Sequence, residues 1–188
     1  MIEEQSYWRA DLTKYAQRLK RRYGKLRWSK QTLYEIEKEV FLSAFIIRKL
    51  IESGKVDRAV LGLNFQIKKY PIRPGAVRST DPKTLGSIYD IYHGRDEILS
   101  IKKLCDQFVH SYIFSPLIIS RTHGVVFGLY FSSDCESEKG LYYIPLIKVI
   151  EIITSSACNR PIKIKLSKKV DGTFNVKCES GRELERDR

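Results

Sequence analysis

The feature that most constrains the fold is an apolar stripe at three- and four-residue spacing between residues 29 and 54. Its members are Leu33, Ile36, Val40, Ala44, Ile47 and Ile51, thickened by Phe41, Phe45 and Leu50. This period predicts one face of an α-helix. Ser29 suits the N-cap, with a competing capping box at Thr32 and Glu35, and Gly54 suits the stop. So broad an apolar face is expected at the centre of the core.

Two further segments have helical patterns. Residues 6–27 combine a sparse apolar side with a heavily basic one. Residues 95–114 carry a heptad-like stripe of Ile98, Ile101, Cys105, Phe108 and Tyr112. Ser115-Pro116 would end this helix, because a residue that precedes proline disfavours the helical region. Helices therefore dominate the expected structure of the first 115 residues.

The pattern changes after residue 116. PLIISRT and GVVFGLYFSSD are β-branched and aromatic, and they predict two strands joined at His123-Gly124. A further helix is expected from about Pro145, where proline suits the first turn. Residues 161–178 form a hairpin pattern. Residues 60–72 alternate in part and predict one short strand, which a proline-rich loop follows.

These patterns predict an α+β fold. We expect an N-terminal antiparallel helical bundle over residues 1–115. Residues 116–180 are expected to form a small antiparallel sheet with one further helix, packed on the same core. Residues 181–188 form a charged tail that is expected to fray.

The formal net charge of +12 over 188 residues favours anionic partners. Nucleic acid is the first candidate, an acidic protein surface the second and an anionic membrane the third. A basic protein without a polyanionic partner is the remaining alternative, because net charge indicates partners only loosely.

The four cysteines have no CxxC pair and do not cluster with the three histidines, so no zinc site is expected. Their wide spacing is typical of free thiols in a reducing cytosol. The first fifteen residues lack a signal-peptide pattern, and the longest apolar run, residues 40–47, is too short for a membrane span. A cytoplasmic protein without cofactors is therefore expected.

One candidate catalytic group lies in LCDQFVHSY, residues 104–112. Asp106 and His110 are four residues apart, so their side chains can touch on a helix, and Lys103 lies on the same face. A carboxylate at this distance would orient the imidazole and fix its tautomer. The alternative is that this face is simply the solvated side of an amphipathic helix.

LCDQFVHSY resembles the motif of the HEPN superfamily, small helical bundles of prokaryotic toxins and antiviral defence systems. In that motif an Arg, usually followed by a polar residue, precedes a His, and an aromatic residue often follows. Asp106, His110 and Tyr112 match the last three of these positions. The resemblance covers about residues 6–114, and it implies a metal-independent ribonuclease that acts across a dimer interface.

The Arg position of the motif departs from the family pattern. Cys105 stands four residues clear of His110, and Lys103 stands six residues clear. Lys supplies a positive charge but not the planar fork of a guanidinium, and Cys supplies neither. The resemblance therefore implies a degenerate member that is kept for binding or assembly. If the protein is active, Lys103, Asp106 and His110 would carry the activity.

The basic side of residues 15–28 is a candidate phosphate-binding surface. Its cations are Arg18, Lys20, Arg21, Arg22, Lys25 and Arg27. Such side chains neutralise phosphates and release counterions. Tyr23 and Trp28 could stack on unpaired bases, or the aromatic residues could pack inward. The lysines of IKIKLSKK are a second cationic strip, which could equally protect an edge strand from aggregation.

No Walker loop, GxSxG, HExxH or dinucleotide-binding motif is present. Three functions therefore remain open. The first is a subunit that binds nucleic acid, RNA above all, or that assembles within a prokaryotic defence or toxin–antitoxin system. The second is a variant HEPN endoribonuclease that uses His110 and Lys103. The third is an interaction subunit that binds an acidic protein partner.

Overall fold

A computed structural model describes residues 4–23, 28–77, 79–119, 125–158, 163–168 and 174–179. The helices are α1 (Gln5–Arg22), α2 (Lys30–Glu52), α3 (Arg58–Leu61), α4 (Leu85–Ile88), α5 (Ile101–Val109) and α6 (Leu146–Cys158), with a short 3-10 turn, η1 (Pro82–Thr84). The strands are β1 (Asn64–Tyr70), β2 (Arg95–Ser100), β3 (Ser111–Ile119), β4 (Val125–Ser133), β5 (Leu141–Pro145), β6 (Lys163–Lys168) and β7 (Phe174–Glu179).

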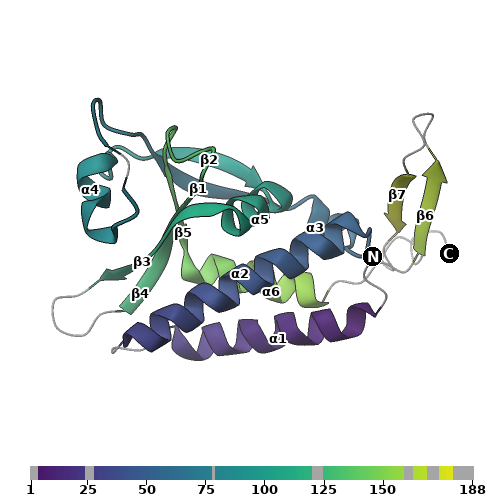
Figure 1. The fold of residues 1–188 in the computed structure, drawn as a ribbon. Helices are drawn as coiled ribbons and strands as arrows, with labels where there is room; N and C mark the ends of the chain where they lie inside the picture. Colours follow the sequence, from purple (N-terminus) through teal and green to yellow (C-terminus); the bar gives the residue numbers. More distant parts are fainter. Residues whose placement is uncertain are drawn as a thin grey trace.

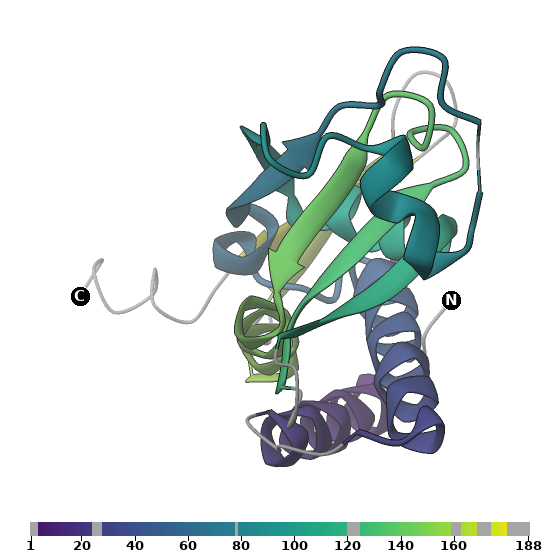
Figure 2. The same cartoon turned by 90° about the vertical axis from the view of Figure 1, so that its left-hand side faces the viewer.

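Five of the strands form one antiparallel sheet in the order β2-β1-β5-β4-β3. Helices α5 and α6 pack on this sheet, and the long hairpin of α1 and α2 packs on them (Figure 1). Figure 1 and Figure 2 show α4 apart from α1, α2, α5 and α6, and its Leu85 and Ile88 pack with Ile113 and Leu141 in a second, smaller core cluster. The predicted α+β class is confirmed, and β6 and β7 form the predicted C-terminal hairpin.

Helix α2 follows its sequence pattern. The Ser29 hydroxyl accepts a hydrogen bond from the Thr32 N–H at 3.2 Å, as an N-cap does. Gly54 follows the helix with a φ of 67°, a conformation that glycine adopts at little cost. Most of the predicted apolar face is buried in the main core, and its most deeply buried members are Ile36, Val40, Ala44, Ile47 and Leu50, but Phe45 is 40% exposed.

The predicted helix over residues 95–114 is wrong at both ends. Residues 95–100 form β2 and residues 111–119 form β3, so only the nine residues of α5 are helical. The apolar stripe holds for Ile101, Cys105 and Phe108, which are buried, but Ile98 is 69% exposed. The six residues of β2 gain a full ladder with β1, which local periodicity does not reveal.

The sheet takes strands from both sides of residue 115. β1 and β2 lie in the segment where a helical bundle was expected, and β1 pairs with β5 from the later segment. Pro116 lies within β3 rather than at a helix end. An edge strand tolerates proline, because one of its sides needs no N–H donors. Residues of both segments contribute to the main core, and the expected antiparallel helical bundle over residues 1–115 is not found.

Arg9 does not belong to the exposed basic side of α1. It is 2% exposed and donates to the carbonyls of Ser156 at 2.6 Å, Ala157 at 3.3 Å and Lys55 at 2.5 Å. Ser156 and Ala157 lie in the last turn of α6, where carbonyls lack helical partners. The guanidinium therefore ties α1 to the end of α6.

Candidate functional site: the His110 cluster and the basic helix end

His110 is the C-cap residue of α5. It is exposed, and its backbone N–H donates to the Asp106 carbonyl at 3.1 Å. The imidazole Nε2 lies 2.9 Å from Nη1 of Arg48, which α2 supplies. A guanidinium only donates hydrogen bonds, so Nε2 must accept. This contact requires a neutral imidazole with its proton on Nδ1.

Arg48 also contacts two carboxylates. Its Nε lies 2.8 Å from Oε1 of Glu52 and 3.2 Å from Oδ1 of Asp106. Hydrogen bonding to Glu52 raises the pKa of Arg48, and desolvation only partly opposes this. The cluster therefore joins one cation, two carboxylates and a neutral imidazole. No sequence signal pointed to Arg48, which is 62 residues away from His110.

Lys103 does not join this cluster. Its Nζ lies 3.8 Å from Oε1 of Glu97 on β2. Lys103 precedes His110 by about two turns, or about 10 Å along the axis of α5. Of the three candidate catalytic residues, the structure thus brings Asp106 and His110 together with Arg48 and turns Lys103 toward the sheet.

Cys105, at the Arg position of the motif, is buried with Ile101 and Phe108 in the main core. Burial raises the pKa of its thiol to about 12. A thiol that stays protonated is a poor nucleophile, so this position does not replace the missing arginine.

The cations at the end of α1 divide into two groups. Arg22 is half-buried and bonds Glu35 at 2.5 Å and, more closely still, Glu39. Arg18 lies 3.8 Å from Glu39 and remains half exposed. The charges of these two arginines are therefore partly neutralised by carboxylates of α2.

Lys20 and Arg21 form the second group. Both are exposed, and within the described part of the chain neither makes an ion pair. Lys25 and Arg27 lie outside the described residues. The cations available to an external anion on α1 are therefore Lys20 and Arg21, with Arg18 in part.

Some aromatic residues of the α1–α2 hairpin pack against the core, and others are exposed to solvent. Tyr15 and Trp28 pack against the core, as the inward alternative expected. Tyr23 is 37% exposed, and Tyr34 on α2 is 56% exposed. Tyr34 was missed in the sequence, because it stands among charged residues outside the apolar stripe.

Tyr34 borders a groove of about 360 Å³ between α1 and α2. The other residues around this groove are Tyr15, Arg18, Arg22, Gln31, Glu35, Lys38 and Glu39. Glu39 is 4% exposed, and desolvation raises the pKa of its carboxyl although Arg22 and Arg18 oppose this. The groove thus combines an exposed ring, peripheral cations and an acidic floor.

Among the described residues, no group of three or more His, Cys, Asp or Glu side chains could hold a metal ion. None of the described helices is both long and apolar enough to cross a membrane.

A scan against protein-family models gave no match, and searches of curated proteins and of solved structures likewise found nothing similar to this chain. The resemblance of residues 104–112 to the HEPN motif stays a prediction.

Proposed function

We propose that this protein binds nucleic acid, with single-stranded RNA preferred, through the basic end of the α1–α2 hairpin. The supporting observation is the exposed ring of Tyr34 at the rim of a groove whose rim also carries Arg18 and Lys38. Cations that neutralise phosphates beside an exposed ring are the usual means of holding unpaired nucleotides. The proposed setting, a prokaryotic defence or toxin–antitoxin assembly, rests on the HEPN resemblance alone.

Lys20 and Arg21 supply the phosphate contacts in this proposal. The test is fluorescence anisotropy of a labelled 12-nucleotide RNA at several salt concentrations, with duplex DNA beside it. The double variant Lys20→Ala/Arg21→Ala should weaken binding and reduce the salt slope by about 1.4, since each contact with a single strand contributes about 0.7.

Lys83→Ala/Lys102→Ala is the matched control, because both lysines are exposed and neither belongs to α1 or α2. It removes the same charge and should leave the salt slope close to that of the unaltered protein. Equal effects of the two double variants would contradict a localised interface. Binding of neither RNA nor DNA at physiological salt would contradict the proposal and favour an acidic protein partner.

The contact between Arg48 and His110 favours a second candidate, a metal-independent endoribonuclease. In this alternative Arg48 takes the phosphate-binding role that the sequence offered to Lys103, and His110 would activate the RNA 2′-OH. Its test is cleavage of a mixed RNA pool in EDTA. Activity lost in His110→Ala and Arg48→Ala but kept in Lys103→Ala would support it, and an inactive unaltered protein would exclude it.

A further inference from the structure

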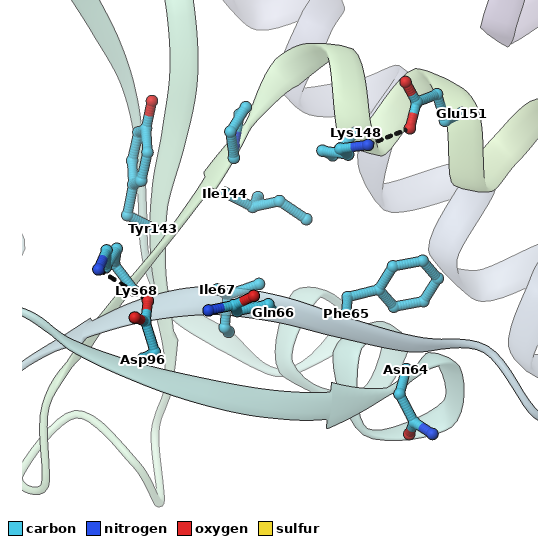
Figure 3. Close-up of a pocket in the computed structure, with 11 residues that line it drawn as sticks. Asn64, Phe65, Gln66, Ile67, Lys68, Asp96, Tyr143, Ile144, Lys148 and Glu151 are labelled. Atoms are coloured by element: carbon cyan, nitrogen blue, oxygen red, sulfur yellow. Dashed lines mark hydrogen bonds and ion pairs between the residues drawn. The ribbon is translucent and has the colours of Figure 1, made fainter.

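A groove of about 650 Å³ lies between β1 and the junction of β5 with α6 (Figure 3). Within the described chain, β1 pairs with β5 only over residues 68–70. Two residues further back, the same register would place Gln66 opposite Pro145. Proline has no N–H to donate, and its carbonyl begins α6, whose first residue is Leu146. The ladder therefore stops, and among the described residues no strand lies beside β1 on this side over residues 64–67.

The backbone of β1 directs hydrogen-bonding groups into this groove. On the opposite side, toward β2, the Leu63 carbonyl accepts from the Ile101 N–H at 3.2 Å. Successive residues of an antiparallel strand direct their backbone groups to opposite sides. Phe65 and Ile67 therefore bond with β2, whereas Asn64 and Gln66 direct their N–H and C=O groups toward the groove. Asn64 and Gln66 are exposed, so their backbone groups are open to a further strand, as at the edge of a sheet.

The groove also has apolar walls. Phe65 packs against the core but remains partly exposed, and Ile67 and Ile144 are buried beside it. Figure 3 shows Phe65 on β1 facing the space that Ile144 borders on the other side. An occupant would therefore meet apolar contacts next to unpaired backbone groups.

The charged residues around the groove are paired with one another. Lys68 lies 2.7 Å from Asp96, and Lys148 lies 2.8 Å from Glu151 (Figure 3). Each cation is neutralised by its own carboxylate, which leaves no surplus charge for a phosphate. The groove therefore has no net positive charge to attract nucleic acid, although the chain as a whole is basic.

We propose that this groove binds an extended, uncharged peptide segment of a partner protein, which adds to β1 as a strand. Asn64 and Gln66 are about 6.6 Å apart along the strand, which is the two-residue repeat of an extended chain. Alternate apolar side chains of the peptide would face Phe65 and Ile144. Backbone bonds would give affinity and the side-chain contacts would give specificity. This binding function is independent of the proposed nucleic-acid interface.

The test begins with selection of random displayed ten-residue peptides on the immobilised full chain. The enriched peptides are then measured against Gln66→Pro and Ile98→Pro. The Gln66 N–H faces the groove and is not part of the β1–β2 ladder, so proline there removes a groove donor and leaves that ladder intact. Gln66→Pro should weaken binding about tenfold or more, since it removes a hydrogen bond and places a ring in the groove.

Ile98→Pro is the matched control. Ile98 is exposed on the edge strand β2, and by the same alternation its N–H faces away from β1. Peptide binding should be unchanged in this variant. Loss of binding in Ile98→Pro but not in Gln66→Pro would place the peptide on the outer edge of the sheet and overturn the proposal. Equal binding to all three proteins, or no enriched peptide, would also overturn it.

Amide hydrogen exchange gives a readout that does not depend on the folding of a variant. A selected peptide should slow exchange at Asn64 and Gln66 in the unaltered protein. Exchange at Phe65 and Ile67, which already bond with β2, should stay the same. Uniform protection of all four amides, or displacement of the peptide by a 12-nucleotide oligouridylate, would contradict strand addition.

Discussion

The Nη1 atom of Arg48 lies 2.9 Å from Nε2 of His110, so α2 makes a polar contact with the end of α5, which is far from it in the sequence. Arg48 is itself fixed by Glu52 and Asp106. This arrangement positions the imidazole and favours one tautomer, whether its role is binding or chemistry.

The tautomer of His110 is directly measurable. We expect the neutral ring to carry its proton on Nδ1, because Nε2 accepts from Arg48. Long-range ¹H–¹⁵N correlation spectra at alkaline pH should show an unprotonated Nε2, and Arg48→Ala should shift the population toward the other tautomer. A ring protonated at Nε2 in the unaltered protein would contradict the contact.

Tyr34 is expected to contribute to RNA binding by stacking. Tyr34→Ala should weaken single-stranded RNA binding by about 1–3 kcal/mol, the usual value for one stacked base. Tyr7→Ala is the matched control, because Tyr7 is 74% exposed on α1 but lies near the opposite end of that helix. Similar losses in the two variants, measured by anisotropy at one salt concentration, would exclude a specific role for Tyr34.

Arg9 is expected to stabilise the fold rather than bind a ligand. Arg9→Ala leaves three backbone carbonyls without their donor, and we expect the free energy of unfolding to fall by about 3 kcal/mol or more. Lys14→Ala, on the exposed side of α1, should change it by less than about 0.5 kcal/mol. Urea denaturation of both variants checks the difference, and equal midpoints would refute the assignment.

The pair of Lys69 and Glu136 predicts a pH window of stability. Their charged atoms lie 3.2 Å apart, and Lys69 also contacts Glu97 at 3.4 Å. The pKa of Glu136 is lowered, because bonds from Lys139 and Lys69 outweigh desolvation. The pKa of Lys69 is raised, because bonds with Tyr142 and Glu136 outweigh desolvation.

The two shifts have opposite consequences for stability. The contribution of Glu136 is present above its unfolded pKa of about 4.3 and is lost as the pH falls through its lower folded pKa. That of Lys69 is present below its unfolded pKa of about 10.4 and is lost as the pH rises through its higher folded pKa. A double-mutant cycle of Lys69→Met and Glu136→Gln should therefore give a coupling of about 1 kcal/mol at neutral pH. The coupling should vanish in strong acid, and a coupling independent of pH would contradict the pairing.

Local periodicity predicted the helices that bury one face and that have capping residues at their ends. The stripe from Ile36 to Leu50 and the cap at Ser29 give α2 almost to the residue. The same criterion failed over residues 95–114, because the spacing of Ile98 and Tyr112 matched a stripe that neither residue joins. Only pairing with β1 and β4 distinguishes β2 and β3 from a longer helix.

The sequence by itself determined the helices α1, α2 and α6, the C-terminal hairpin, the large basic charge and the adjacency of Asp106 and His110. These depend on residues a few positions apart. Tertiary structure alone decided that Arg48 contacts His110 and that Arg22 pairs with Glu35 and Glu39. It also decided that β1 separates from β5 before Pro145 and leaves a groove there. Such contacts join distant segments, whose meeting depends on the packing of the whole core and not on any local preference.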